Sequence, residues 1–147
     1  MQLTWHGHST WHVRIKNTTF LIDPFFNNPK TSLKPSDIDP PDYVLLTHGH
    51  ADHIGDVGSF SNSTIVATPE LTSYISDDYG VDSTISMNIG GTIQVGSGYV
   101  TMQRADHTNG YSNKYSAGGD MPAGYLVSDA PPREAAKGNG ESFYHAG

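Results

Sequence analysis

The sequence predicts a fold of class α+β, in which sheets stack on each other and a few helices lie outside them. Short apolar and β-branched segments open the chain, a strand–helix–strand order follows in the middle, and further short strands fill the last third. Runs of strands on both sides of a helical segment favour this class over an all-β fold.

The first quarter of the chain is expected to form three strands joined by turns. Their segments are rich in apolar, aromatic and β-branched side chains, and they are residues 2–6, 11–15 and 19–23. Residues 24–42 hold five of the nine prolines, which indicates a surface loop. The apolar run at residues 43–46 then predicts a buried strand.

Two helices and several more strands are expected after that run. Residues 54–60 can form a short helix, and Pro69 suits the first turn of a longer one, with Thr68 as its N-cap and Gly80 at its end. Residues 130–140 are expected to form a turn. The remaining predicted strands are residues 64–67, 84–86, 92–95, 99–104, 124–128 and 142–145.

The composition limits the possible functions. The 147 residues fit one domain, with 35% hydrophobic residues and a formal net charge of −7. The eight lysines and arginines form no cluster, which argues against a nucleic-acid partner. There is no cysteine, no basic leader and no apolar window of membrane-spanning length, so we expect a cytoplasmic protein that contacts no membrane.

Four side chains that can bind metal follow the predicted strand at residues 43–46. Residues two apart on an extended segment face the same side, so His48 and His50 can share one metal. Asp52 and His53 come after two small residues and can face a second metal. Imidazole and carboxylate ligands suit Zn²⁺, with Mn²⁺ or Fe²⁺ as alternatives. The other interpretation is a polar loop in which the histidines occur by chance.

A third histidine for the first metal is expected from another strand end. His107 follows the predicted strand at residues 99–104. With His48 and His50 it would give the three-histidine set that catalytic zinc sites use. The alternative is a surface histidine beside an acidic loop.

Several motifs resemble those of the metallo-β-lactamase superfamily. Residues 47–53 read Thr-His-Gly-His-Ala-Asp-His, which matches its H-x-H-x-D-H signature. The other matching features are Trp5-His6-Gly7-His8-Ser9, Phe20-Leu21-Ile22-Asp23-Pro24, Met87-Asn88-Ile89-Gly90-Gly91 and Tyr144-His145-Ala146-Gly147. Together they resemble the branch of uncharacterised metal-dependent hydrolases related to L-ascorbate-6-phosphate lactonase. This resemblance implies a four-layer αββα fold. It also implies that His48, His50 and His107 hold the first metal, and Asp52 and His53 the second.

The sequence departs from the family pattern at its end. The family continues His-Ala-Gly with an aspartate that bridges both metals, and its last metal histidine lies further on, whereas this chain ends at Gly147. We therefore expect residues 1–147 to be one metallo-β-lactamase-like domain, the N-terminal portion of the fold, truncated before the bridging aspartate. A strand that stops at His145 would leave an unpaired edge, so a complementary C-terminal segment or a homo-oligomer is expected.

The resemblance implies roles for two more residues. Asp23 would brace the histidine loop from behind, and an ordinary strand-end residue before proline is the alternative. His8 would face the active-site side and contact substrate or the surroundings of the metal, and an ordinary turn histidine is the alternative. Three further histidines lie in or near predicted strands and are expected to be structural; they are His6, His12 and His145.

Aromatic residues are expected in the core and beside the site. The expected core aromatics are Trp5, Trp11, Phe20 and Tyr99. The long polar loop at residues 106–122 includes Tyr111 and Tyr115. Such a loop can gate a site, and an ordinary exposed loop is the equal alternative.

These features predict a hydrolase that uses a metal-activated water on an ester, lactone or phosphoester of a small molecule. Asp52 would bind metal and orient the attacking water, so it is the expected catalytic residue. Neither a G-x-S-x-G pattern nor a phosphate-binding loop appears in the sequence. Two alternatives remain: a nuclease or phosphodiesterase of the same fold, and a non-catalytic metal-binding fragment.

Overall fold

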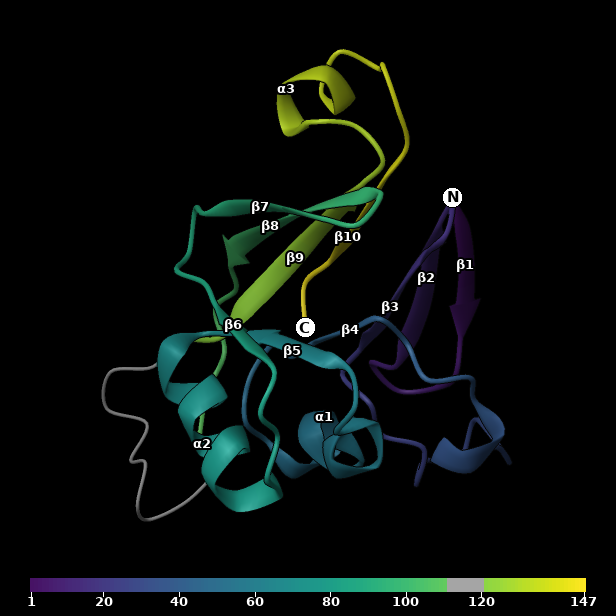
Figure 1. The fold of residues 1–147 in the computed structure, drawn as a ribbon, viewed down its shortest axis with the longest axis vertical. Helices are drawn as coiled ribbons and strands as arrows, with labels where there is room; N and C mark the ends of the chain where they lie inside the picture. Colours follow the sequence, from purple (N-terminus) through teal and green to yellow (C-terminus); the bar gives the residue numbers. More distant parts are fainter. Residues whose placement is uncertain (111–120) are drawn as a thin grey trace.

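The structure is a computed structural model that describes residues 1–110 and 121–147 (Figure 1). One sheet contains, in spatial order, β1 (Gln2–Trp5), β2 (Trp11–Ile15), β3 (Thr18–Ile22), β4 (Tyr43–Leu45), β5 (Thr64–Ala67) and β6 (Thr84–Ser86). The other contains β10 (Ser142–His145), β9 (Ala123–Ser128), β8 (Gly98–Arg104) and β7 (Thr92–Val95). The helices are α1 (Ala51–Ile54), α2 (Pro69–Tyr79) and α3 (Pro132–Ala135), with 3₁₀ turns η1 (Pro35–Asp37) and η2 (Val57–Phe60).

The first sheet changes from antiparallel to parallel pairing at β3. Strands β1, β2 and β3 form the predicted meander of antiparallel neighbours, because short turns join them. Strands β3 to β6 are parallel, and longer connections join them. Parallel strands place their carboxyl ends at one edge, so the segments after β3 and β4 leave the sheet side by side.

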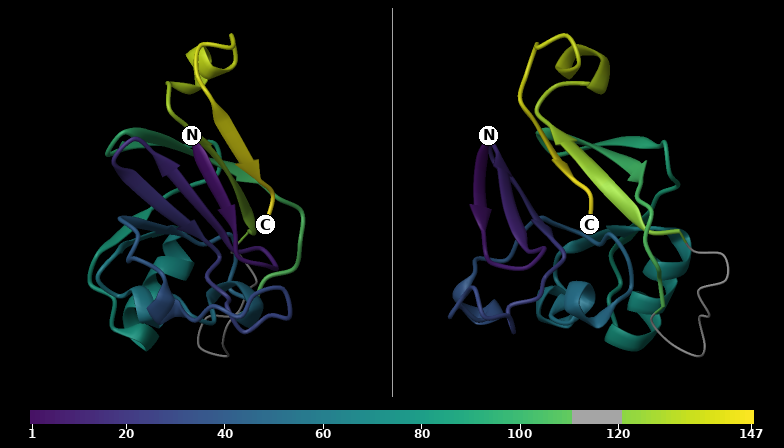
Figure 2. Two further views of the ribbon diagram at one scale, coloured as in Figure 1. Left: turned by 90° about the vertical axis from the view of Figure 1, so that its right-hand side faces the viewer. Right: turned by 180° about the vertical axis from the view of Figure 1, so that it is seen from behind.

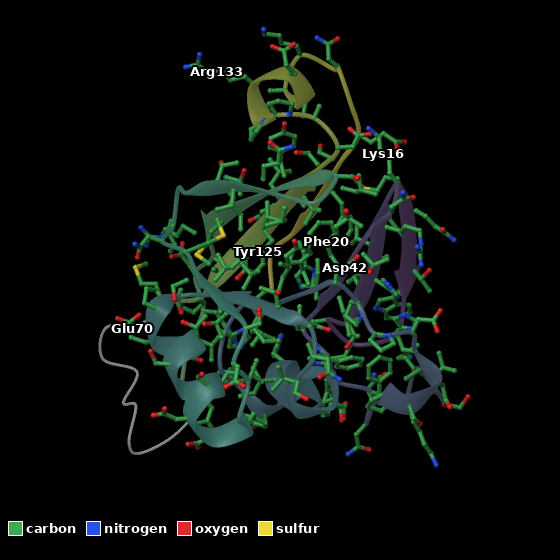
Figure 3. All side chains as sticks on the ribbon, viewed as in Figure 1. Lys16, Phe20, Asp42, Glu70, Tyr125 and Arg133 are labelled. Carbon is green, nitrogen blue, oxygen red and sulfur yellow. The ribbon has the colours of Figure 1, made fainter. Side chains whose placement is uncertain are left out.

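Two apolar cores separate three layers of structure (Figure 2). Alternate residues of a strand face opposite sides. Leu45 of β4 therefore packs between the two sheets, and its neighbour Val44 packs against α1, η2 and α2. Phe20 and Tyr125 both belong to the core between the sheets (Figure 3). The described residues thus form one layer of helices and two of sheet, with α3 beyond the strand ends (Figure 1).

The predicted class is confirmed, and most element bounds agree with it. Strands β2, β5, β6, β7 and β10 have the predicted bounds, and α2 begins at Pro69 and ends before Gly80, whose φ is +66°. No helix in residues 1–110 and 121–147 is long and apolar enough to cross a membrane.

Thr68 is the N-cap residue of α2, as predicted, although its side chain makes no capping hydrogen bond. Other details of the prediction are wrong. The helix expected over residues 54–60 is two elements, because α1 begins earlier, at Ala51, and η2 follows it. The turn at 130–140 contains the short helix α3. Trp5 is 50% exposed, because β1 is an edge strand whose residues face solvent.

Candidate metal centre

The segment after β4 carries the histidine cluster. Leu46 and Thr47 connect the end of β4 to the buried His48. His50 is still extended, with φ −67° and ψ 146°, and it is the N-cap residue of α1. Asp52 lies in the first turn of that helix, and the amide of His53 donates to the carbonyl of His50. His48 and His50 thus precede the helix, whereas Asp52 and His53 lie within it.

The first group of candidate ligands contains the three histidines predicted from the sequence. His48, His50 and His107 each offer a ring nitrogen, and the three atoms lie within 4.8 Å of one another. The His107 ring centroid lies 4.9 Å from that of His48 and 5.4 Å from that of His50. His107 follows β8, so this first triad joins the two sheets.

The second group contains Asp52, His53 and His8. Their ligand atoms also lie within 4.8 Å of one another. His8 Nε2 lies 3.3 Å from Asp52 Oδ2, and His53 Nε2 lies 4.0 Å from Asp52 Oδ1. The sequence placed Asp52 and His53 here, and it placed His8 near the site without making it a ligand. The second triad is next to the first, because the ring centroids of His48 and His53 are 4.0 Å apart.

Asp23 lies behind both triads and is completely buried. Its Oδ1 accepts a hydrogen bond from the Thr47 amide at 2.8 Å, and its Oδ2 accepts one from the Thr47 hydroxyl at 2.6 Å. His53 Nδ1 lies 2.7 Å from Oδ2, and His145 Nε2 lies 3.5 Å from it. The place of Asp23 agrees with the bracing role expected from the sequence. Its φ of +45° and its burial do not fit an ordinary turn residue.

These hydrogen bonds fix the tautomers of two candidate ligands. An ionised carboxylate only accepts hydrogen bonds, so His53 Nδ1 carries the proton in its bond to Asp23 and Nε2 faces the cluster. The Thr47 hydroxyl has one hydrogen, which it donates to Asp23. It must therefore accept from His48 Nδ1 at 3.0 Å, which leaves His48 Nε2 with a lone pair. One carboxylate thus orients an imidazole in each triad.

The local electrostatics support neutral and anionic ligands. Burial alone raises the pKa of Asp23, but hydrogen bonds from His145 and His53 outweigh it and lower that pKa to about 2. Burial, helped by the nearby His53, lowers the pKa of His48 to about 4, so this ring is neutral at pH 7. Burial also lowers the pKa of His53, but the hydrogen bond and charge of Asp23 outweigh burial and raise it. A metal that binds His53 therefore competes with a proton more than one that binds His48.

Asn109, for which no role was predicted from the sequence, connects two loops of the site. Its Oδ1 accepts a hydrogen bond from the Gly49 amide at 2.9 Å. Gly49 lies between His48 and His50, and Asn109 lies two residues after His107, so this contact holds the three parts of the first triad together. A polar residue two positions after a candidate ligand was the available signal. Tyr111 and Tyr115, the expected gate residues, lie outside the described residues.

The histidines expected to be structural have different surroundings. His6 is buried and His12 partly buried, away from both triads, with ring centroids 6.1 Å apart. Burial lowers the pKa of each. His145 is buried beside Asp23, so its contact belongs to the hydrogen-bond group behind the site.

Members of both triads line one cleft of about 570 Å³, namely His48 and His107 of the first and all three of the second. The cleft is also lined by Ser9, Arg104 and Tyr144. The donor set of five imidazoles and one carboxylate fits a divalent metal such as Zn²⁺, because these groups are its usual nitrogen and oxygen ligands. The fixed tautomers of His48 and His53 support the same conclusion, since each leaves Nε2 directed away from its hydrogen-bond partner.

Stacked sheets with helices on one face, and two imidazole-rich triads after strand ends, are the arrangement of a protein that can hold metal ions at the edge of its sheets. The sequence profile of the metallo-beta-lactamase superfamily matches residues 3–72. A UPF0173 metal-dependent hydrolase of Haloquadratum walsbyi is 57% identical over 147 residues, which are 100% of this chain and 62% of that protein. One from Methanopyrus kandleri is 39% identical over 153 residues, with 100% of this chain and 61% of that protein covered. The first half of this chain thus matches the metallo-beta-lactamase superfamily, and the whole chain is similar to UPF0173 metal-dependent hydrolases.

Solved structures agree with this fold. Igni18, a metallo hydrolase from Ignicoccus hospitalis, aligns with a TM-score of 0.77 and 25% identity over 99% of this chain and 59% of its own. CmlA, a diiron beta-hydroxylase from Streptomyces venezuelae, aligns with a TM-score of 0.70 and 19% identity over 98% of this chain and 28% of its own. CmlA is only 19% identical to this chain, so its similarity shows the fold alone. This chain thus spans about 62% of its first curated relative.

Proposed function

We propose that the protein containing this chain is a metal-dependent hydrolase that acts on an ester, lactone or phosphoester of a small molecule. The observation that carries the proposal is the pair of adjacent triads, both of which contribute residues to the lining of one cleft. His48, His50 and His107 would hold one metal, and Asp52 and His53 would hold another. Zn²⁺ suits these ligands, and Mn²⁺ or Fe²⁺ are alternatives.

Each part of the site has a distinct task in this proposal. A bound divalent metal supplies an activated water at neutral pH and positive charge for a developing oxyanion. Asp52, which is half exposed to the cleft, accepts a hydrogen bond from the attacking water and orients it toward the substrate. Asp23 keeps the His48 and His53 rings in the tautomers that can bind metal.

A small substrate is favoured over a nucleic acid. Among the described residues that line the cleft, Arg104 is the only lysine or arginine, and its Nε donates to Asp106 Oδ1 at 2.7 Å. A nuclease of the same fold would need more cationic side chains along its phosphate path. We also propose a cytoplasmic location for the protein, as the sequence predicts.

We further propose that residues beyond this chain complete the cleft. The UPF0173 relatives are longer than this chain, which spans 62% of the one from Haloquadratum walsbyi. Strand β10 is an edge strand, and its Tyr144 is 53% exposed and lines the cleft. A further segment of the longer protein would pair with this edge and contribute the remaining metal ligands. A homo-oligomer and a non-catalytic metal-binding fragment are the alternatives, and the molecular mass and metal content of the full-length protein distinguish them.

Metal content tests the ligand assignment. The variants His48→Ala and His50→Ala should lose the metal of the first triad, because each removes one of its three imidazoles. Metal bound after gel filtration is measured by elemental analysis. His12→Ala is the control, because it removes a histidine that lies away from both triads. If His48→Ala or His50→Ala keeps the full metal content of the wild type, the assignment is wrong.

A further inference from the structure

The turn between β1 and β2 has a tightly defined conformation. Gly7 has a φ of +91°, and a Cβ at this residue would lie 2.1 Å from Asn28 Oδ1. The His6 amide donates to the Thr10 carbonyl at 2.9 Å, and the Thr10 amide donates to the Gly7 carbonyl at 3.0 Å. Glycine at position 7 thus permits a turn that any residue with a Cβ would prevent.

His8 has an unfavourable backbone conformation in that turn. Its φ is +49°, a region that residues with a Cβ rarely adopt. The Trp5 indole Nε1 donates to the His8 carbonyl at 2.9 Å and helps to hold it. Backbone strain of this kind persists where the surrounding structure fixes it, and it is concentrated at functional sites. In this conformation the His8 residue lines the cleft, and its functional part there is the imidazole.

The His8 side chain ends beside the second pair of candidate ligands. Its Nε2 lies 3.3 Å from Asp52 Oδ2, and its ring meets that of His53 edge to face with centroids 5.1 Å apart. Its other side packs edge to face on Phe25, with centroids 5.6 Å apart. The ring therefore has one polar direction, toward Asp52 and His53.

We propose that His8 is a third protein ligand of the second metal, together with Asp52 and His53. This rests on the proposed function, in which a metal binds at that position. Two imidazoles and one carboxylate are a ligand set that zinc sites use. The sequence predicts two ligands for this metal, and His8 adds a third from the same chain to those that a further segment would contribute.

A simple ion pair between His8 and Asp52 is a weaker explanation. The His8 side chain is 35% exposed and the Asp52 side chain 51%, and ion pairs at such exposure contribute little. An ion pair also gives no reason for the three ligand atoms to converge within 4.8 Å. A shared metal explains both the convergence and the strained turn.

Zinc affinity of the full-length protein tests the proposal. Asparagine adopts positive φ more readily than most residues, so His8→Asn should keep the turn while removing the imidazole. We expect its second-site Zn²⁺ affinity to fall by more than about tenfold. Loss of a residue that only supports a metal ligand costs at least about tenfold, and loss of a ligand should cost more. First-site affinity should not change. Competition with a chromophoric chelator measures both affinities, and the Co²⁺ absorption spectrum reports the ligands.

Two further variants sharpen the test. His8→Asp also tolerates the turn and supplies a carboxylate ligand, so it should retain more second-site affinity than His8→Asn. Lys16→Asn is the matched control, because Lys16 has a φ of +52° in another turn and is exposed. It should bind both metals like the wild type.

The outcomes separate this proposal from the proposed function. If His8→Asn binds the second Zn²⁺ as tightly as the wild type, or more tightly because Asp52 has lost its partner, His8 is not a ligand. The proposed function would survive that result. If the wild-type protein binds no Zn²⁺, Mn²⁺ or Fe²⁺ at all, the proposed function fails and the ligand assignment fails with it.

Discussion

Asp23 is the residue through which the two triads are connected. It contacts His53 directly and reaches His48 only through the Thr47 hydroxyl. The contact of Asp23 with His53 and its indirect contact with His48 can therefore be tested separately by substitution. A change at Thr47 affects one triad, whereas a change at Asp23 affects both. This separation is the basis of the first prediction.

Thr47→Val should weaken metal binding at the first triad and leave the second nearly unchanged. Valine has a similar shape but cannot accept from His48 Nδ1, so the tautomer of that ring is no longer fixed. Loss of such a partner typically costs 10–100-fold in metal affinity, and we expect about tenfold here. Asp23→Asn should weaken both triads. Chelator competition for Zn²⁺ measures each site, and equal losses at both sites in Thr47→Val would contradict the argument.

At the residue scale, sequence reasoning identified the candidate ligands that are close together in the chain. His48, His50, Asp52 and His53 follow one strand end, so spacing alone brought them together. His107 could be inferred because it also follows a strand. The direct contact of His8 with Asp52, and the link from Asn109 to Gly49, depend on how loops from different strands meet. No local pattern encodes that meeting.

At the element scale, local signals decided which predictions succeeded. Pro69 and Gly80 mark the two ends of α2, because proline suits a first turn and glycine a left-handed end. The start of α1 was missed because its first turn is made of Ala51, Asp52 and His53, which the sequence indicated as ligands rather than helix formers. Trp5 was placed in the core because edge position follows from sheet order, which its own segment does not show.

The β1–β2 hairpin should make stability depend on pH. His6 Nε2 and His12 Nε2 are buried and have no hydrogen-bond partner among the described residues. Burial lowers the pKa of each ring below 6.5, and for His12 the charges of His6 and Arg14 lower it further, against Asp39. Below pH 6.5 the unfolded chain therefore binds protons that the folded chain does not. Stability is present above that pH and is lost as pH falls.

The variant His12→Gln should reduce this dependence. Urea denaturation of metal-free protein between pH 7.5 and 5.5 measures the slope of the free energy of unfolding against pH. One proton contributes at most about 1.4 kcal/mol per pH unit, so the slope should fall by less than that. The metal-free protein is used because His48 and His53 otherwise exchange protons for metal. An unchanged slope in His12→Gln would show that the hairpin does not cause the dependence.

At the scale of the whole molecule, the metal centre lies where the two sheets meet. The Ala123 amide at the start of β9 donates to the Thr47 carbonyl at 2.8 Å. The Tyr125 hydroxyl, also from β9, donates to the carbonyls of Leu46 and Val66 at 2.8 and 3.1 Å. The first triad takes His107 from the second sheet, whereas the second triad takes all its members from segments that follow strands of the first. The packing of the sheets therefore affects the two triads unequally.

Tyr125→Phe tests this coupling. The ring stays buried between the sheets, but Leu46 loses a hydrogen-bond donor to its carbonyl, so the free energy of unfolding should fall by about 1–3 kcal/mol. With that link between the sheets removed, His107 should be held less firmly beside His48, and first-triad Zn²⁺ affinity should fall more than that of the second. Tyr99→Phe makes the same chemical change at a partly buried residue of β8. It should lower the free energy of unfolding and the first-triad Zn²⁺ affinity by less than Tyr125→Phe does. Denaturant unfolding and chelator competition measure the two effects. Equal losses of affinity at both triads would show that the sheet interface does not select the first site.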